Sequence, residues 1–333
     1  MKGNNSFGEI WDKIKGSSNV LMTLHSAPDG DSIGSCLSMK YVLDIMRIKC
    51  KIVGYDPVPE NLEDFEFLDE IELGTDISDV DFNEFDLILF FDCGAMSYIS
   101  GKLRKELKIP KNVFKINIDH HLSNTYHGDM NYVDSSKASC CSVLIDFFKF
   151  KGINFNKDLC TRLLLGVSTD TLYFTTEDSP SAIIEAGFLI EKGGDYLEVL
   201  KKSYFNEPLK MHKYYSLLFD KLVIDKRGFG YSLITNSEVN KLGLNESEAR
   251  LGISKMQFTK ELKFVFNLIE FPDHIKGSFR SKKGIDVSKF AVELGGGGHK
   301  FASAFRLSKM TLNDARDKVI SAIDKVIENQ EIH

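Results

Sequence analysis

The first half of the chain alternates short apolar runs with segments whose apolar residues recur at helical spacing. Strands are expected over 20–24, 49–53, 86–91 and 113–118, and helices over 31–46, 139–150 and 159–168. This alternation of strand and helix indicates βαβ crossovers, and hence an α/β domain built on a parallel sheet with helices on both faces.

The second half has a different order of elements. Between residues 173 and 204 the pattern stays helical, with a helix start at Ser179 before Pro180; polar residues and Pro208 then interrupt it over 201–210. Beyond this point we expect helices over 212–220 and 246–256, strands over 221–225, 229–235, 263–271 and 275–280, and a closing amphipathic helix over 312–329. The pattern predicts a first domain over 1–200, a linker near 201–210 and a smaller α+β domain over 211–333.

The composition of the chain is that of a globular protein without a membrane span. The chain has 333 residues, of which 43% are hydrophobic and 27% charged, and no apolar run approaches the ~20 residues of a membrane helix. The N-terminal segment lacks the apolar block of a secretory signal, so we expect a cytoplasmic protein without a membrane span. A formal net charge of −6 disfavours binding to long duplex nucleic acid, but it leaves room for a small anionic ligand.

Cysteine does not provide an evident metal or redox motif. The six cysteines are Cys36, Cys50, Cys93, Cys140, Cys141 and Cys160, and no two of them form a Cys-x-x-Cys pair. We interpret them as small buried hydrophobic residues.

The segment LHSAPDGDSIGS, residues 24–35, is the strongest local signal for chemistry. A strand ends at an imidazole, His25, and a tight turn then presents Asp29 and Asp31 before a helix, with Gly30 expected to allow the turn between the two acids. The alternative is that both carboxylates only cap the helix and that His25 is a satisfied core residue.

Three more segments place acids or imidazoles at the ends of apolar runs. Asp92 follows a strand; Asp119, His120 and His121 end another; and Asp170 follows an apolar helix. Consecutive side chains on extended backbone point to opposite sides, so the two imidazoles are expected to do different jobs. Taken singly, Asp92 and Asp170 could equally be turn or cap residues.

Taken together, these residues favour a metal site. The carboxyl ends of parallel strands meet at one edge of a sheet, where open α/β folds bind their substrates. Carboxylates with imidazoles and no thiolate suit manganese or magnesium, and a site rich in carboxylates can hold two ions about 3.5–4 Å apart. Such a pair activates water and stabilises in-line displacement at phosphorus.

A glycine-rich stretch, LGGGGHKFASAF over 294–305, is the second signal. Its glycines would let backbone N–H groups wrap an anion, and His299, Lys300 and the upstream Arg280 add donors. The alternative is a flexible turn between a helix and a strand.

The motifs HSAPDGDSIGS, FDCG, IDHH and STDT, followed by SFRS and GGGGHKFASAF, occur in an order that resembles the DHH phosphoesterases with a DHH-associated (DHHA type 1) C-terminal domain. The resemblance covers nearly the whole chain. The motifs resemble in particular those of the NrnA-like branch, whose bacterial members are bifunctional oligoribonucleases and 3′-phosphoadenosine 5′-phosphate (PAP) phosphatases.

The resemblance implies a role for each matching residue. One manganese ion would be held by His25, Asp29 and Asp92, and the other by Asp31, Asp92, His120 and Asp170. Asp119 would orient the adjacent imidazole, and His121 would contact the scissile phosphate or assist the leaving oxygen. The second domain would bind the far phosphate or terminal nucleotide through Arg280, Gly296, Gly297, Gly298 and His299, with the active site in the cleft between the domains.

The resemblance also implies the activity: hydrolysis of short single-stranded RNA, from dinucleotides to a few nucleotides, to 5′-mononucleotides, with PAP as a further substrate. Two alternatives stay open, a phosphodiesterase for cyclic or linear dinucleotide messengers and a non-catalytic nucleotide-binding relative. Tyr98 stands about where family members often carry arginine, and Ser303-Ala304 replaces the usual Ala-Gly after the glycine-loop histidine. Both differences from the family pattern leave the expected metal ligands unchanged and affect the expected choice of substrate. A homodimer is left open as the assembly.

Overall fold

The computed structural model describes residues 3–103, 107–176, 179–282 and 284–331. The chain divides into two compact units, Met1–Asn206 and Glu207–His333, and each is described by itself. The division falls inside the segment 201–210 that we expected to link the domains.

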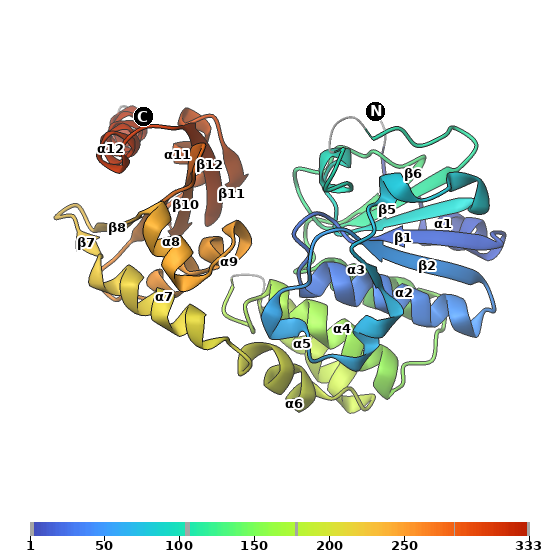
Figure 1. Ribbon diagram of the computed structural model, residues 1–333. Helices are drawn as coiled ribbons and strands as arrows, with labels where there is room; N and C mark the ends of the chain where they lie inside the picture. The colour runs from blue at the N-terminus through green and yellow to red at the C-terminus, as the bar shows by residue number, and fades with distance from the viewer. Residues whose placement is uncertain (1–2, 104–106, 177–178, 283, 332–333) are drawn as a thin grey trace. The chain divides into compact units, whose positions relative to one another are not determined.

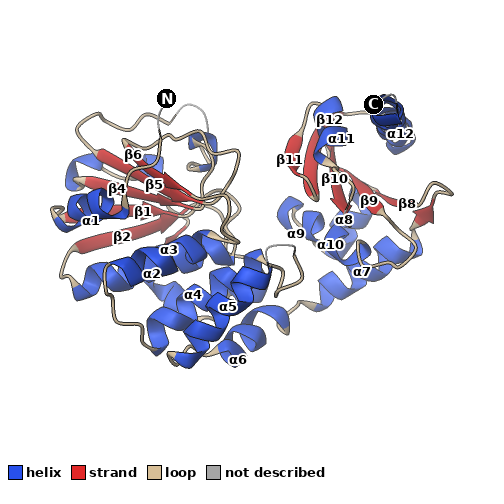
Figure 2. Ribbon diagram, turned by 180° about the vertical axis from the view of Figure 1, so that it is seen from behind, coloured by secondary structure: helices blue, strands red, loops and turns tan. Residues whose placement is uncertain are grey.

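The first unit is built on a six-stranded sheet in which every pair of neighbouring strands is parallel (Figures 1 and 2). Its strands are β1 (Asn19–Thr23), β2 (Lys49–Gly54), β3 (Glu72–Leu73), β4 (Leu87–Phe91), β5 (Phe114–Asp119) and β6 (Met130–Val133). They lie in the order β3-β2-β1-β4-β5-β6. The parallel α/β fold expected from the sequence is therefore confirmed.

Two layers cover this sheet. The helices of the unit are α1 (Phe7–Lys15), α2 (Gly30–Ile45), α3 (Cys140–Phe150), α4 (Lys157–Asp170), α5 (Ser179–Glu191), α6 (Tyr196–Val199) and a one-turn π-helix, η7 (Leu200–Tyr204). On one face, Val20 and Met22 of β1 pack into a large core with α1 to α5; Figure 2 shows α2 and α3 along this face. On the other face, Leu21 packs against short 3₁₀ helices, η3 (Ile77–Asp79) and η5 (Met96–Tyr98), and against loops.

Two glycines of α2 allow it to pack closely against α4. A Cβ atom added to Gly30 would lie 2.3 Å from Oγ1 of Thr169, and one added to Gly34 would lie 2.6 Å from the carbonyl oxygen of Arg162. The sequence predicts that Gly30 allows a tight turn between two acids, and this is wrong. Gly30 is the first residue of α2, and the left-handed turn lies at Ala27, where φ is 54°. Gly30 is needed for close packing, which brings the end of α4 to the start of α2.

The second unit is a mixed sheet with a core on each face. Its strands are β7 (Val223–Ile224), β8 (Phe229–Ile234), β9 (Phe264–Glu270), β10 (His274–Ser281), β11 (Gly297–His299) and β12 (Ala302–Ser308), in the order β11-β12-β10-β9-β8-β7. Its helices are α7 (Leu209–Asp220), α8 (Asn236–Leu242), α9 (Glu246–Leu251), α10 (Ile253–Met256), α11 (Ser288–Glu293) and α12 (Leu312–Glu331). Helices α11 and α12 cover one face and α7 to α10 the other, as expected for an α+β unit.

Several short strands could not be predicted from the sequence. The two- and four-residue strands β3 and β6 are too brief to show a period of two, and β11 lies within the glycine run, where side-chain pattern carries no information. The helix expected over 246–256 is two helices, because α9 ends at Leu251 and α10 begins at Ile253.

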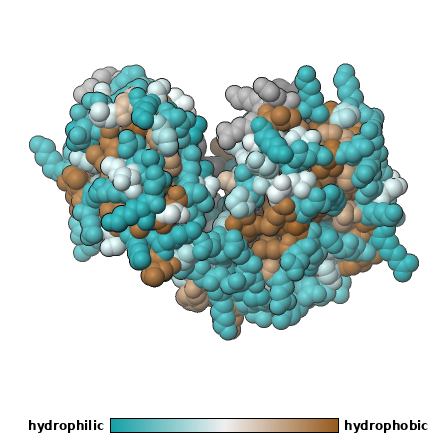
Figure 3. All heavy atoms as spheres, in the orientation of Figure 1, coloured by the Kyte–Doolittle hydropathy of each residue, from teal (hydrophilic) through white to brown (hydrophobic). Residues whose placement is uncertain are grey.

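Within the part of the chain that the structure describes, no helix combines the length and the apolar character needed to cross a bilayer. Figure 3 shows one face of the molecule, on which hydrophilic residues predominate and hydrophobic residues gather in smaller patches.

Candidate metal centre

Three adjacent parallel strands deliver their side chains to one edge of the first sheet. His25 lies two residues beyond β1, Asp92 follows β4 directly, and Asp119 is the last residue of β5, with His120 and His121 next. Because β1, β4 and β5 are neighbours and run in parallel, their carboxyl ends converge. The last member of the group, Asp170, ends α4.

Asp92 lies at the centre of this group. Its Oδ2 is 3.3 Å from Nε2 of His25, and its Oδ1 is 3.4 Å from Nε2 of His120. Its backbone has a φ of 53°, a left-handed conformation that non-glycine residues adopt rarely and at a cost of order 1 kcal/mol. The sharp turn of the chain after β4 thus presents one carboxylate with its two oxygens facing different imidazoles.

The side chains form three overlapping clusters, in each of which the candidate ligand atoms all lie within 4.8 Å of one another. The clusters are His25, Asp29 and Asp92; Asp31, His120 and Asp170; and Asp92, Asp119, His120 and His121. The structure therefore brings together every residue of the first domain that the sequence analysis assigned to the site. Asp92 and His120 each belong to two clusters, which places them between two possible ion positions.

The rings of His25 and His120 are both oriented with Nε2 toward the carboxylates of the centre. Nδ1 of His25 lies 2.9 Å from the carbonyl oxygen of Ser26, and Nδ1 of His120 lies 3.3 Å from that of Lys137. When each Nδ1–H donates to its carbonyl, the lone pair on Nε2 is left to face the carboxylates, which is how metal-ligating histidines are usually oriented. Sequence reasoning could not find these two carbonyl groups.

Two atoms in the centre lack the partners that buried polar atoms normally have. Among the described residues, neither Nε2 of His120 nor Oδ1 of Asp92 has a hydrogen-bond partner, although both are buried and lie 3.4 Å apart. Such atoms carry a desolvation penalty unless something compensates them. A divalent cation between the imidazole nitrogen and the carboxylate oxygens fits this observation, and the all-oxygen and nitrogen donor set suits manganese or magnesium.

The pKa values show how strongly these charges interact. Burial raises the pKa of Asp31, and the charge of Asp92 adds to this, to about 7; burial also raises that of Asp170 well above its usual value. Burial opposes protonation of His25, but its hydrogen bond to Asp92 and the charge of Asp29 outweigh this and raise its pKa to about 10. Without a cation the centre therefore retains protons, which a bound metal would displace.

Asp31 has a structural partner that the sequence did not indicate. Its fully buried carboxylate accepts hydrogen bonds from the backbone N–H groups of Cys140 (2.6 Å) and Cys141 (2.9 Å) in the first turn of α3. The sequence left open that Asp31 caps its own helix. Asp31 instead binds the first turn of α3, and Asp29 caps α2 by accepting from the N–H groups of Asp31 and Ser32. Both carboxylates can cap helices and still face the cluster.

His121 is held by Asp119. Nδ1 of His121 lies 2.8 Å from Oδ1 of Asp119, which also accepts from the backbone N–H of His120, while the buried Asn124 donates to its other oxygen. We expected the two imidazoles to point to opposite sides of a strand, and this is wrong, because β5 ends at Asp119 and the two rings lie 4.6 Å apart. They still differ in role, since His120 directs Nε2 and His121 directs Nδ1 toward Asp92.

In the second unit, the expected anion cradle has the form of a strand rather than a loop. Gly297 and Gly298 belong to β11, at the edge of the sheet, and pair with Ala304 and Ser303. Gly296 has no room for a side chain, because an added Cβ would lie 2.2 Å from the carbonyl oxygen of Ala304. Ala302 pairs with His299 on one side and with Arg280 on the other, so these two residues share a row of the sheet. The side chain of His299 lies outside what the structure describes.

The guanidinium of Arg280 is suited to an anion. Its Nη1 donates to the carbonyl oxygen of Phe279, and burial, together with the charge of Arg250, lowers its pKa to about 10. Ser303, which replaces the alanine usual in the family, is buried, and its hydroxyl donates to the carbonyl oxygen of Val287. The replacement therefore does not alter the contacts of the Arg280 guanidinium.

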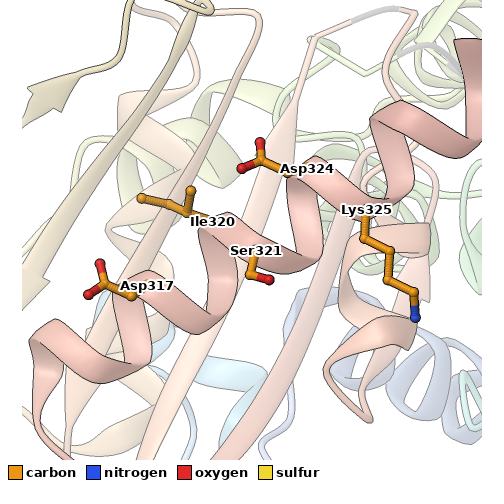
Figure 4. Close-up of a pocket in the computed structure, with 5 residues that line it drawn as sticks. All are labelled: Asp317, Ile320, Ser321, Asp324 and Lys325. Atoms are coloured by element: carbon orange, nitrogen blue, oxygen red, sulfur yellow. The ribbon is translucent and has the colours of Figure 1, made fainter.

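A surface hollow elsewhere in the second unit does not resemble a reaction site. Its lining residues are Asp317, Ile320, Ser321, Asp324 and Lys325, all on α12 (Figure 4). They include no imidazole and none of the residues assigned from the sequence, so we assign no function to it.

Comparison with known proteins agrees with this geometry. The family model "DHH family, N-terminal domain" matches residues 19–167, and the model "DHHA1 domain" matches residues 232–329. The chain therefore carries a DHH family N-terminal domain followed by a DHHA1 domain.

Individual relatives are distant in sequence but match almost all of this chain. It is 25% identical to the "bifunctional oligoribonuclease and PAP phosphatase NrnA" of Thermus thermophilus over 97% of each protein. It is 26% identical to the "cyclic-di-AMP phosphodiesterase PdeA" of Listeria monocytogenes, over 95% of this chain and 49% of that protein. Among solved structures, an exopolyphosphatase-related protein from Bacteroides fragilis shares the fold, with a TM-score of 0.82 at 20% identity over 97% of this chain and 95% of the other.

Proposed function

We propose that this protein is a manganese-dependent phosphodiesterase that hydrolyses short RNA, from dinucleotides to a few nucleotides, to 5′-mononucleotides. The single observation that carries the proposal is the carboxylate of Asp92, whose two oxygens face His25 and His120 in separate clusters of acids and imidazoles. The NrnA protein of Thermus thermophilus, similar over the full length, supports the substrate class. We expect removal of the 3′-phosphate of PAP as a second activity.

The proposal assigns two ion positions. One ion would be held by His25, Asp29 and Asp92, and the other by Asp31, Asp92, His120 and Asp170. When bound, a pair of divalent cations supplies charge that offsets the phosphate and lowers the pKa of the attacking water. The buried acids position this charge, because Asp31 is held by two backbone N–H groups and Asp92 by the turn after β4.

His121 is proposed to act on the substrate itself. Burial opposes its protonation, but the hydrogen bond to Asp119 and the charge of Asp92 raise its pKa above the usual value. A protonated His121 can donate from its ring to a phosphate oxygen or to the leaving oxygen. Asp119 then acts as a positioning residue, and Asn124 holds Asp119 in turn.

The second unit is proposed to bind the far phosphate or the terminal nucleotide through Arg280, Gly296, Gly297, Gly298 and His299. Burial and the charge of Arg250 lower the pKa of the Arg280 guanidinium, and a bound phosphate would compensate both effects, which supports this assignment.

The test is direct. The protein, loaded with Mn²⁺, is incubated with the 5′-phosphorylated dinucleotide pApA, and AMP is quantified by chromatography. We expect two AMP per pApA; metal-loaded, folded protein that releases no AMP would contradict the proposal. Faster turnover of cyclic di-AMP than of pApA would favour the messenger phosphodiesterase, and tight binding of pApA without turnover in any metal would favour a non-catalytic binder.

A further inference from the structure

Large hydrophobic side chains are exposed on the loops that leave the candidate metal centre. Leu122 directly follows His121 and is 82% exposed, the highest value among the large hydrophobic residues that the structure describes. Tyr98 is 57% exposed and Leu172, two residues beyond Asp170, is 39% exposed. We call Leu122, Tyr98 and Leu172 the apolar rim.

The exposure of Leu122 is built into a fixed turn. The backbone N–H of Asn124 donates to the carbonyl oxygen of His121, which closes a turn with Leu122 and Ser123 at its tip. The side chain of Asn124 is buried and donates to Asp119 and to the carbonyl oxygen of Cys93. The leucine is therefore held outward beside an imidazole of the centre by anchored backbone.

Tyr98 is connected to the same centre through the segment that holds His25. Its carbonyl oxygen accepts a hydrogen bond of 2.7 Å from the backbone N–H of Ser26, whose own carbonyl oxygen orients His25. Two hydrogen bonds thus connect the exposed tyrosine to the His25 ring.

Leu172 lies on strained backbone. Leu172, Tyr173 and Phe174 all have positive φ, at 47°, 56° and 67°, a conformation that costs each of them free energy of order 1 kcal/mol. The Thr171 hydroxyl accepts from the N–H of Phe174, and the N–H of Leu172 donates to the carbonyl oxygen of Thr169, so this turn is fixed as well. Three loops that leave three different candidate ligands therefore each expose an apolar side chain.

We propose that the apolar rim contacts the base and sugar of the nucleotides that flank the scissile phosphate, so that the centre selects nucleotides over inorganic phosphate chains. Ligand sites combine apolar and aromatic side chains with a few polar groups, and bases stack on aromatic side chains. An inorganic polyphosphate has no apolar part to cover Leu122 or Tyr98. The ion pairs of the described residues at the centre join only imidazoles and carboxylates, whereas the nearby Lys137 ammonium is paired with Asp146 and Glu185.

The inference rests on the proposed phosphodiesterase activity and identifies the base and sugar as the parts of the substrate that the apolar rim contacts. It is tested with two substrates, pApA and a matched dinucleotide whose bases are replaced by hydrogen, using Leu122→Ser and Tyr98→Ser. Ile45→Ser is the matched control: Ile45 is 59% exposed and ends α2, the helix that begins at the centre, so it lies about 22 Å from Gly30 along the helix.

We expect wild-type protein to show a KM for pApA roughly tenfold below that for the base-free dinucleotide, since a stacked base contributes about 1–3 kcal/mol. Each rim substitution should raise the KM for pApA about fivefold, change kcat less than about twofold, and leave the KM for the base-free substrate unchanged. The conservative variants Leu122→Met and Tyr98→Phe should keep the wild-type KM, and Ile45→Ser should have no effect.

Equal effects of the rim substitutions on both substrates, or no effect on either, would overturn the inference while leaving the phosphodiesterase proposal intact. Failure of wild-type protein to cleave either dinucleotide would instead contradict the phosphodiesterase proposal. Equilibrium binding of non-hydrolysable phosphorothioate forms of the two ligands then tests the rim separately. The inference about the apolar rim would be overturned if wild-type protein bound the base-containing and the base-free ligand with the same affinity and if the rim substitutions left both affinities unchanged.

Discussion

The carboxylate of Asp31 lies 2.6 Å from the backbone nitrogen of Cys140, so an acid of the candidate metal centre on α2 also caps the first turn of α3. A helix N-terminus favours a carboxylate because its first N–H groups have no partner within the helix. The same side chain thus joins two helices of the scaffold and faces His120 and Asp170.

This double role predicts different effects for two neighbouring acids. Asp31→Ala should destabilise the protein by about 2 kcal/mol in the presence of EDTA, because it leaves two buried backbone N–H groups unpaired. Asp170→Ala should leave stability unchanged or raise it, since burial and like charges already disfavour that carboxylate. Urea unfolding of both variants in EDTA at pH 6 measures the difference, and equal stability of Asp31→Ala and wild-type protein would refute the capping role.

Asp92 should be required for both ions. We expect Asp92→Ala to bind less than one Mn²⁺ per chain and to lose activity by at least about a thousandfold, because both ion positions share its carboxylate. Asp29→Ala, which removes a ligand of one position only, should retain one ion. Equilibrium dialysis with metal analysis gives the stoichiometry; an Asp92→Ala variant that still binds two ions would show that the carboxylate does not bridge.

Metal binding should strengthen as pH rises. Asp31, with a pKa of about 7, and His25, with one of about 10, hold protons that a cation must displace, so protons compete with the metal at low pH. In metal-free protein the raised pKa values contribute stability that is present at low pH and is lost as pH rises through them. The increase in melting temperature caused by Mn²⁺ should therefore be larger at pH 8 than at pH 6. Differential scanning calorimetry at both pH values checks this, and an increase that is larger at pH 6 would contradict it.

His121 should affect turnover without affecting the ions. His121→Gln is expected to lower kcat by about a hundredfold while two Mn²⁺ stay bound, because the ring donates a proton to the substrate and is outside the two assigned ligand sets. Its raised pKa places activity on the acidic side of that pKa, so the wild-type rate should fall as pH rises through it. The pH–rate profile and metal content are measured together; loss of an ion in His121→Gln would make this residue a ligand instead.

Arg280 should act on substrate binding. Arg280→Met is expected to raise the KM for pApA about tenfold with little change in kcat or metal content, since a charge-assisted phosphate contact is lost. Arg227→Met offers a control, because Arg227 is a cation of the same unit that is already paired with Asp225 and Asp324. Similar KM values for the two variants would argue against an anion site at Arg280.

The sequence predicted the α/β class and the main strands well, because buried parallel strands appear as continuous apolar runs and their ends carry the polar residues. Asp92 and His120 could be assigned to one site for that reason, whereas Asp170 ends a helix. The partners that hold them could not be predicted: the N–H groups of Cys140 and Cys141 reach Asp31 from a distant helix, and any residue type could supply them.

The backbone conformation within the motifs could not be predicted from the sequence either. The two imidazoles of the IDHH motif were expected on opposite sides, but β5 ends at Asp119, before the first imidazole, and the two rings lie 4.6 Å apart. Glycine at position 30 allows both a turn and a close packing contact, and only the structure shows that Thr169 occupies the space of a side chain. The assignment of the substrate to Arg280 and the glycine strand, in a cleft between the two units, stays a prediction.

Anomalous diffraction from crystals grown with Mn²⁺ tests the central claim most directly. We expect two anomalous peaks about 3.5–4 Å apart, one on the side of Asp92 that faces His25 and one on the side that faces His120. Absence of ions at Asp92, or manganese bound only at other sites on the chain, would contradict the account.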